Sequence, residues 1–398
     1  MKLILVNEAR VVTGAMESIA RAAAEQGFDV EVCTGDNLYR SVTQDEDASS
    51  GEELYHHRRL RTLGSRTNTV TRLLLTASFV VSAFGHLMST PKPAIFVLFS
   101  QPPFLHLLIP WLKRTATAKV VSVQMDRYPD ILFAHGVLSH RGLPGRILRY
   151  LDLRGLKDAD AVVCIGRDMR RQLLDHGVPA SSLALVPNWT SDLRPGARSL
   201  AEPRPEPEAG GLTVLYSGNM GVAHSFDELL DAAERMSPDE PITLTIRGTG
   251  RRWQEVSDEV RRRGLTRVKM HGLLPFDEYA QTIRASDLVL ITLRQGFEGV
   301  LVPSKYYAAL SAGRPVVFVG PEESEIAQSI HEEQCGAVIA NGDAQTLMNV
   351  LRRYARDRDR IERHGRNARH AFERRYTEAA GVERYLALVT AVARTSRK

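Results

Sequence analysis

Residues 298–320 read Glu-Gly-Val-Leu-Val-Pro-Ser-Lys-Tyr-Tyr-Ala-Ala-Leu-Ser-Ala-Gly-Arg-Pro-Val-Val-Phe-Val-Gly, and they predict a loop, a helix and a strand in succession. The loop contains two turn formers, Gly299 and Pro303. The helix is expected to end at Gly313, and the apolar run 316–319 is typical of a parallel strand that is buried on both faces. This succession indicates an α/β protein.

The start of the predicted helix has the features of an anion site. Ser304 occupies the position where an N-cap is preferred, and Lys305 follows in the first helical turn. Backbone N–H groups, the positive end of the helix dipole and the Lys305 ammonium would then meet at one point, beside the loop residues Glu298, Gly299 and Val300. A diphosphate group would fit there.

The rest of the chain alternates apolar runs with amphipathic segments, which is the βαβ rhythm of a doubly wound parallel sheet. The predicted strands of the first half are 3–6, 29–33, 94–99, 120–124 and 161–164, and the predicted helices are 14–26, 71–88, 103–114 and 143–157. The predicted strands of the second half are 213–216, 242–247, 268–270, 288–291 and 316–319. We therefore predict two Rossmann-like α/β domains.

A polar, proline-rich run at 194–211 is the predicted linker between these domains. It separates an N-terminal domain, 1–193, from a C-terminal domain, 212–375. Residues 376–398 are expected to form a final helix. The length of 398 residues suits two domains of ordinary size.

Cysteine usage and the N-terminus both favour a reducing cytoplasm. Cys33, Cys164 and Cys335 lie far apart, so they predict neither a disulfide framework nor a metal site. Residues 3–6 form too short an apolar run for a signal peptide and are expected to be the first strand. No catalytic metal and no cofactor are predicted.

The net charge of +5 comes entirely from residues 1–200, and no acidic residue occurs between Glu53 and Asp126. Nine basic residues fall in that interval: Arg58, Arg59, Arg61, Arg66, Arg72, Lys92, Lys113, Arg114 and Lys119. Two apolar segments, 73–88 and 104–112, are shorter than the roughly 20 residues that span a bilayer. Basic residues beside apolar helices predict docking onto an anionic membrane surface, with a buried core helix and a solvated basic flank as the alternative. Nucleic acid is disfavoured, since aromatic residues are not interleaved with the basic ones.

The stretch 298–320 contains two motifs, Val-Pro-Ser-Lys at 302–305 and Ala-Gly-Arg-Pro-Val at 312–316, and a third, Tyr-Ser-Gly-Asn-Met-Gly, lies at 216–221. Together with Ser-Gln-Pro-Pro-Phe at 100–104, Met-Asp-Arg-Tyr-Pro-Asp at 125–130 and Val-Pro-Asn-Trp at 186–189, they resemble glycosyltransferase family 4. The resemblance covers nearly the whole chain and is strongest to the branch that builds bacterial exopolysaccharide, O-antigen and colanic acid.

This resemblance implies the GT-B architecture, in which two Rossmann-like domains face each other across a cleft. The donor would be a nucleotide diphosphate sugar, with UDP as the expected nucleotide, and would bind the second domain. A lipid-linked or saccharide acceptor would bind the first. The last helix would cross back onto the first domain. The implied activity is retaining and metal-independent, at the inner face of the cell membrane.

The donor site implied by the resemblance draws on several loops of the second domain. The turn Gly218-Asn219-Met220-Gly221 follows a strand, so its glycines would let the backbone approach a phosphate; a plain βα turn is the alternative. The family cradles the nucleotide base at the positions of Arg247, Leu273 and Leu274. Glu298 would bind a donor hydroxyl, unless it is a solvated loop carboxylate.

In the first domain, two residues are candidates. Gly14 opens a helix after the first strand and could approach the donor phosphate, although a helix-packing glycine fits equally. Asp126 follows the strand 120–124 and could bind acceptor or donor hydroxyls. Gln124 and Met125 stand where many family members carry a histidine, so no imidazole base is offered.

The chain departs from the family pattern at two positions. His224 stands where many members place an Arg and a Lys, so His224 and Lys305 would have to carry the positive charge. Ala308 replaces a glutamate that contacts the nucleotide ribose. These departures leave three alternatives open: a nucleotide-sugar epimerase, a small-molecule tailoring transferase and a non-catalytic nucleotide-sugar binder.

Overall fold

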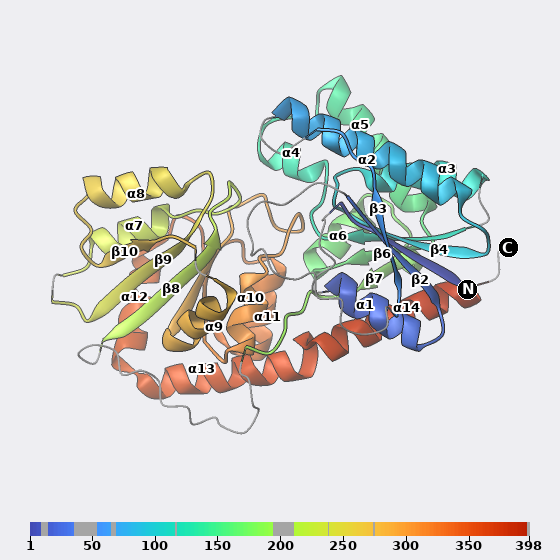
Figure 1. The fold of residues 1–398 in the computed structure, drawn as a ribbon. Coiled ribbons are helices and arrows are strands. Elements are labelled where there is room, and N and C mark those ends of the chain that lie inside the picture. Colours follow the sequence, from blue (N-terminus) through green and yellow to red (C-terminus); the bar gives the residue numbers. More distant parts are fainter. Residues whose placement is uncertain are drawn as a thin grey trace. The chain divides into compact units, whose positions relative to one another are not determined.

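The computed structural model describes residues 1–8, 15–35, 54–64, 69–115, 118–193, 211–237, 239–273 and 275–395. The chain forms two compact units, and each contains one parallel sheet (Figure 1). Unit 1 consists of Met1–Pro187 and Glu378–Lys398, and unit 2 consists of Asn188–Thr377. The predicted linker lies outside the described residues, except for its last residue, Gly211.

Unit 1 is built on a seven-stranded parallel sheet in the order β3-β2-β1-β4-β5-β6-β7. Its strands are β1 (Lys2–Val6), β2 (Asp29–Gly35), β3 (His56–Leu60), β4 (Ala94–Phe99), β5 (Lys119–Gln124), β6 (Ala161–Cys164) and β7 (Leu183–Leu185). The strand order reverses between β1 and β4, as in a doubly wound fold. The predicted α/β class is confirmed.

Two strands of this sheet were not predicted. The edge strand β3 reads His-His-Arg-Arg-Leu, and only Leu60 in it is buried. Charged side chains on a sheet edge discourage pairing with another chain. They also leave the strand without the apolar pattern from which strands are predicted. The other unpredicted strand, β7, has three residues and is therefore too short for any periodicity.

The helices of unit 1 are α1 (Ala15–Glu25), α2 (Thr69–Ser89), α3 (Ile109–Thr115), α4 (Asp130–Ala134), α5 (Leu143–Asp158), α6 (Arg167–Asp175) and α14 (Glu378–Arg394), with a 3-10 turn at Leu105–Leu108 before α3 and another at Ala180–Ser182. The predicted helix 103–114 is interrupted, because Phe104 has a left-handed backbone with φ of 70°. Within unit 1, α14 packs against α1.

The helix α2 is longer than predicted. Its 20-residue segment Val70–Ser89 is long and apolar enough to cross a membrane by length and composition, so the prediction that this segment is too short was wrong. Four side chains at intervals of four residues, Leu75, Phe79, Ala83 and Leu87, are buried in unit 1.

Unit 2 is built on a six-stranded parallel sheet in the order β10-β9-β8-β11-β12-β13. Its strands are β8 (Leu212–Asn219), β9 (Ile242–Thr249), β10 (Val268–His271), β11 (Leu288–Thr292), β12 (Val316–Val319) and β13 (Gly336–Ile339). Its helices are α7 (Asp227–Glu234), α8 (Trp253–Arg262), α9 (Phe276–Ala285), α10 (Lys305–Ser311), α11 (Glu325–Glu333), α12 (Ala344–Arg356) and α13 (Arg358–Ala371), followed by a π-helical turn at Phe372–Tyr376. Only β13 in this sheet was not predicted. The carboxyl ends of β8, β9 and β11 carry the loops that contain most candidate residues.

Candidate functional site

The backbone at the carboxyl end of β8 is packed closely against its neighbours. Gly218 has a φ of +133°, and a Cβ at this position would lie 2.5 Å from Cε of Lys305. A Cβ on Gly248 of β9 would lie 2.0 Å from the carbonyl oxygen of Gly218. The positive φ of Gly218 and the contact between Gly248 and the Gly218 carbonyl favour glycine at both positions, and this packing is compatible both with close approach of a phosphate and with a plain βα turn. Gly221 lies in open space nearby, since only Asn219 comes within 4 Å of its added Cβ.

Lys305 is the cation of this site. Its ammonium lies 5.1 Å from the centroid of the Tyr216 ring and 3.4 Å from Nε2 of His224. Burial lowers the pKa of Lys305 to about 8. Across the described ranges no carboxylate forms an ion pair with it. A desolvated ammonium without a counter-ion is costly, so the site is suited to an anionic ligand.

The surroundings of His224 favour the neutral imidazole, so the positive charge expected at His224 and Lys305 rests on Lys305. Its Nδ1 lies 2.7 Å from the carbonyl oxygen of Thr292, which can only accept, so Nδ1 holds the ring proton. Nε2 therefore presents its lone pair to Lys305. Burial, together with the nearby Lys305 charge, lowers the pKa of His224 to about 3. The imidazole is an acceptor that orients Lys305, and the positive charge belongs to Lys305 alone.

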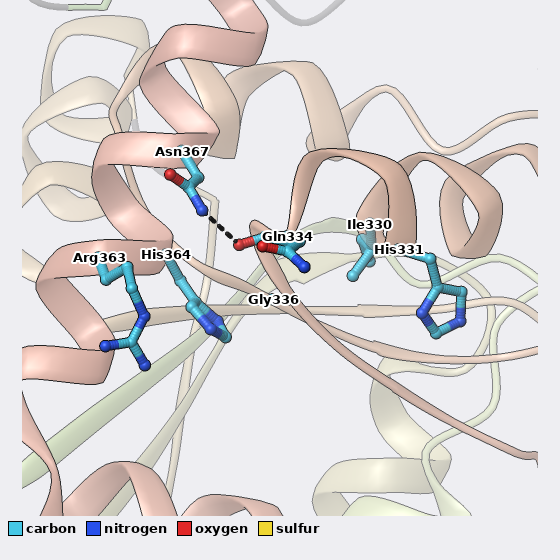
Figure 2. A pocket seen from close by; sticks show the side chains of 7 residues that line it. All are labelled: Ile330, His331, Gln334, Gly336, Arg363, His364 and Asn367. Carbon is cyan, nitrogen blue, oxygen red and sulfur yellow. Dashed lines mark hydrogen bonds between the residues drawn. The ribbon is translucent and has the colours of Figure 1, made fainter.

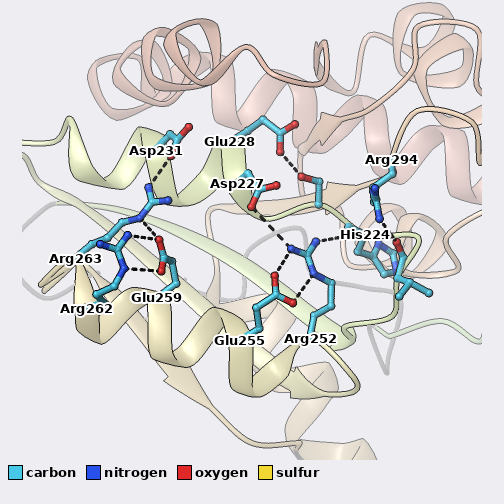
Figure 3. A network of polar contacts seen from close by, with 12 residues as sticks. His224, Asp227, Glu228, Asp231, Arg252, Glu255, Glu259, Arg262, Arg263 and Arg294 are labelled. Carbon is cyan, nitrogen blue, oxygen red and sulfur yellow. Dashed lines mark hydrogen bonds and ion pairs between the residues drawn. The ribbon is translucent and has the colours of Figure 1, made fainter. Parts of the chain in front are cut away.

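Two arginines fasten the loop that contains His224. Nη1 of Arg252 donates to the carbonyl of His224 at 2.8 Å, while its Nη2 pairs with Glu255 at 2.7 Å (Figure 3). Nη1 of Arg294 donates to the carbonyl of Val222 at 3.3 Å. Because the Arg252 charge is already matched by Glu255, we assign it to holding the loop. Sequence reasoning missed this residue, since nothing in its local pattern distinguishes it from a surface arginine of α8.

The start of α10 differs from the prediction. Ser304 has helical angles, φ of −63° and ψ of −21°, and its side chain makes no capping hydrogen bond. A capping serine normally adopts an extended backbone, from which its hydroxyl reaches the next turn. Here the turn begins one residue earlier, since the Tyr306 N–H bonds to the Pro303 carbonyl. The predicted cap is therefore wrong, although Lys305 does occupy the first helical position. Ala308 is buried on the same helix.

The loop before α10 is shaped by its own side chains. The Glu298 carboxylate accepts a hydrogen bond from the Gly296 N–H at 2.7 Å. Gly299 has a φ of +70°, and Val300 is buried. Glu298 is thus only partly exposed and anchors the loop that leads to Lys305.

Arg247 lies near the carboxyl end of β9, between two neighbouring strands. Its register partners are Ser217 on β8 and His271 on β10, so the three side chains share one face of the sheet. Within the described residues, the buried Nε of Arg247 has no hydrogen-bond partner. Leu273 is 60% exposed beyond β10, as a base-cradling loop would be. Leu274 lies outside the described residues.

In unit 1, Asp126 lies just beyond the carboxyl end of β5. Its backbone N–H donates to the Ser100 hydroxyl at 3.2 Å. Its carboxylate is half-buried, and burial raises its pKa. The rings of Phe104 and Tyr128 meet edge to face beside it, with centroids 5.6 Å apart. Gly14 lies outside the described residues, and Asp126 is therefore the one described candidate of unit 1.

Two other residues of the same motif have structural roles. Arg127 is 1% exposed, and its Nη2 pairs with Asp130 at 2.8 Å and with Asp152 at 3.3 Å. His106 contacts the other oxygen of Asp152 at 2.9 Å, and Arg149 pairs with Asp130 at 2.6 Å. The network joins the loop after β5 to α4 and α5, and thereby fixes the position of Asp126.

One group of potential metal ligands lies close together in the described residues: Glu31, Cys33 and His86. Lys2 pairs with Glu31 at 2.8 Å, and Arg58 also pairs with it. Burial raises the pKa of the Cys33 thiol to about 12, so the sulfur is protonated. Two cations and a thiol make this group an ion-pair cluster rather than a cation site.

A cavity of about 370 Å³ lies elsewhere in unit 2 (Figure 2). Its lining residues are Ile330, His331, Gln334, Gly336, Arg363, His364 and Asn367. Gly336 is the first residue of β13, so this cavity is at the amino ends of the strands, away from the loops at their carboxyl ends. Doubly wound sheets bind ligands at the carboxyl ends, and none of the predicted residues lines this cavity.

Comparisons with known proteins match both halves of the chain. Residues 12–189 match the family described as glycosyl transferase 4-like domain, and residues 211–357 match glycosyl transferases group 1. A probable glycosyltransferase, WbjE of Pseudomonas aeruginosa, is 28% identical over 63% of this chain and 64% of its own length. The putative colanic acid biosynthesis glycosyl transferase WcaI of Escherichia coli is 26% identical over 66% of each. The chain thus spans slightly less than two thirds of either relative.

Solved structures with this fold include WaaG, a glycosyltransferase involved in lipopolysaccharide biosynthesis, with a TM-score of 0.70 and 17% identity over 98% of this chain and 100% of that chain. The Anabaena HepE structure in complex with UDP-glucose has a TM-score of 0.68 and 13% identity, with the same coverage. At these identities the likeness concerns the fold, which is GT-B as predicted.

Proposed function

Because this chain belongs to glycosyltransferase family 4, we propose that it is a retaining, metal-independent transferase that moves a hexose-type sugar from a nucleotide diphosphate sugar to an acceptor. UDP is the proposed carrier, since HepE shares the fold and was solved with UDP-glucose. The proposed acceptor is a lipid-linked or saccharide molecule of cell-surface polysaccharide synthesis. Colanic acid and lipopolysaccharide biosynthesis are the roles given to WcaI and WaaG.

The observation that carries this proposal is the state of Lys305. Lys305 is partly buried, its ammonium lies 3.4 Å from the neutral imidazole of His224, and the backbone of Gly218, which has no side chain, packs against it. A diphosphate would supply the missing negative charge and two or more acceptor oxygens. Arg247, whose buried Nε has no hydrogen-bond partner in the part of the chain that the structure describes, supports nucleotide binding at the same edge of the sheet.

In the proposed reaction, the bond between the anomeric carbon and the diphosphate oxygen breaks. The acceptor oxygen then bonds to that carbon on the same face, and the departing phosphate oxygen takes the acceptor proton. No side chain has to act as a base. Lys305 stabilises the charge that develops on the diphosphate, and Asp126 and Glu298 orient hydroxyl groups.

We place this reaction in the cytoplasm at the inner face of the cell membrane. UDP-sugars are cytoplasmic, and a lipid-linked acceptor is held in the bilayer. The basic, acid-poor surface of residues 54–125 supports a peripheral association with anionic lipids.

The test of the donor site is a thermal-shift titration with UDP, GDP and ADP and with their sugar conjugates, with and without chelator. We expect UDP and UDP-sugars to raise the melting temperature, and we expect the shift to survive chelation. No shift with any nucleotide would overturn the assignment of Lys305 and Gly218.

Product analysis separates the alternatives. Incubated with a UDP-sugar alone, an epimerase would produce a second UDP-sugar. A tailoring enzyme would release UDP with soluble sugars as acceptors, whereas the proposed enzyme would release it with a bacterial membrane lipid extract. Binding without release under all these conditions would favour the non-catalytic binder.

A further inference from the structure

Large apolar side chains are exposed on one part of unit 1. The described residues contain fourteen such side chains, and nine of them lie on α2, α3 and α5. These nine are Val70, Leu73, Leu74, Val81, Trp111, Leu143, Ile147, Tyr150 and Leu151. The helix α3 packs against both α2 and α5, and Figure 1 shows the three helices along one side of the sheet. We call this surface the α2–α5 face.

The helix α2 has two apolar sides. Its core side, with Leu75, Phe79, Ala83 and Leu87, is buried. Val70, Leu73, Ala77 and Val81 follow a second helical stripe, and Val70, Leu73 and Val81 are each at least 66% exposed. An ordinary surface helix would be polar along this second stripe.

The helix α5 repeats this arrangement. Leu143, Ile147, Tyr150 and Leu151 are 69%, 51%, 66% and 40% exposed, at helical spacings of three and four residues. Arg146 is exposed within the same stripe. Apolar residues with an arginine among them are the pattern of helices that lie in a membrane interface.

The charge around these helices is mainly positive, since the carboxylates that α5 adds are buried, as Asp152 is, or paired with Arg154, as Asp158 is. Residues 54–151 contain thirteen Lys and Arg residues and only two acidic residues, Asp126 and Asp130. Asp130 is tied to Arg127 and Arg149, and Asp126 is half-buried. Five of the thirteen basic residues form ion pairs, namely Arg58, Lys113, Lys119, Arg127 and Arg149. Arg72, Arg141 and Arg146 are exposed, so the surface offers apolar groups together with exposed arginines.

We infer that the α2–α5 face seats unit 1 on an anionic phospholipid bilayer. A second copy of the chain is a poor occupant, since a two-fold contact would bring basic residues against basic residues. Crossing of the bilayer by α2 is also disfavoured, because its core side packs in unit 1 and His86 lies 3.1 Å from Glu31.

The face adjoins the candidate acceptor residue. Arg72 lies in the same turn of α2 as Leu73. Burial raises the pKa of Tyr128, the Asp126 carboxylate raises it further and the Arg72 guanidinium opposes both, so the charges of Asp126 and Arg72 both act on Tyr128. A lipid-linked acceptor would then reach Asp126 past the first turn of α2. This last step rests on the proposed function, whereas the docking does not.

Vesicle flotation of the full chain tests the docking. We expect binding to phosphatidylcholine vesicles that contain phosphatidylglycerol, and little binding to phosphatidylcholine alone. The double variant Leu73→Asp/Ile147→Asp should lower the bound fraction at least roughly tenfold, because it removes two inserting side chains and adds repelled charge. Arg72→Gln/Arg146→Gln should weaken binding to the anionic vesicles alone. The matched control is Ala285→Asp, at an exposed alanine of α9 in unit 2, which should bind vesicles as the unchanged chain does.

Three outcomes would overturn the inference. They are no flotation of the unchanged chain, equal flotation of the Asp double variant, and a dimer in sedimentation velocity that the double variant dissociates. The UDP-induced thermal shift is measured on the same variants and should stay constant. If UDP causes no thermal shift in the unchanged chain, the result counts against the donor site. If the Asp double variant keeps the UDP-induced shift but no longer floats, the result supports the docking.

Discussion

At the scale of single residues, Lys305 makes the donor site sensitive to pH. Its pKa of about 8 means that the ammonium is fully present below that pH and is lost as pH rises through it. His224 stays neutral across this range, because its pKa is about 3. We expect UDP affinity to fall by up to about tenfold per pH unit above about pH 8. Calorimetric titrations from neutral to alkaline pH measure this. Lys305→Arg should flatten the curve, and an equally steep curve for this variant would contradict the assignment.

Removal of the ammonium gives a second test at this scale. We expect Lys305→Ala to weaken UDP binding roughly 10- to 100-fold, since a charge-assisted hydrogen bond in a desolvated site is lost. Lys157→Ala is the control, because Lys157 is exposed on α5 in unit 1. Equal affinities of the two variants by calorimetry would remove the anion site.

The residues of the site were predictable to different degrees. Lys305 and Gly218 stand in motifs with a local physical reason, namely a cation in the first helical turn and a glycine after a strand. The neutrality of His224 was not predictable, because it depends on the carbonyl of Thr292, 68 positions away. The failure of Ser304 as a cap depends on backbone angles that Pro303 and the preceding loop impose.

At the scale of elements, the contact between the end of β8 and the start of α10 requires a glycine at position 218, which has no side chain. We expect Gly218→Ala to reduce UDP affinity at least about tenfold, because the new Cβ would displace Lys305 as well as strain the backbone. Gly264→Ala is the matched control: its φ is also positive, at +62°, but no atom lies within 4 Å of its added Cβ. Both variants should lose some thermal stability, and a similar loss of UDP affinity in both would show that strain alone is responsible.

The network that joins α4 and α5 gives a stability prediction for unit 1. Arg127→Met leaves Asp152 and Asp130 with less positive charge, so we expect it to lower the free energy of unfolding by about 3–5 kcal/mol. Arg154→Met should cost less than about 1 kcal/mol, because the Arg154–Asp158 pair is exposed. Denaturant unfolding measures both, and equal costs would show that the buried network contributes little.

Strands could be predicted where the burial of their side chains gives the sequence a run of apolar residues. The central strands β1, β4, β11 and β12 are nearly continuous apolar runs, and all four were predicted. The strands β3, β7 and β13 were missed because they are short or lie at sheet edges, where exposure removes the apolar signal. The exposed apolar stripe of α5 was not predicted, because a periodic pattern of apolar residues does not reveal whether that side of a helix is buried or exposed.

At the scale of the whole molecule, the two units differ in charge. The net charge of +5 lies in residues 1–200, which contribute most of unit 1, while the candidate donor site in unit 2 depends on one desolvated ammonium. Salt screens exposed charges over about 8 Å at physiological ionic strength but acts far less on buried ones. The two kinds of binding should therefore respond differently to salt.

We expect an increase in ionic strength from about 0.05 M to about 0.5 M to release most of the chain from anionic vesicles, because exposed arginines such as Arg72 and Arg146 are screened. Over the same range, UDP affinity should change much less, since Lys305 is held in a desolvated site. Flotation and calorimetry in matched buffers measure the two responses. A parallel decline of both would mean that the Lys305 site is as open to solvent as the α2–α5 face, and that the nucleotide binds through surface charge.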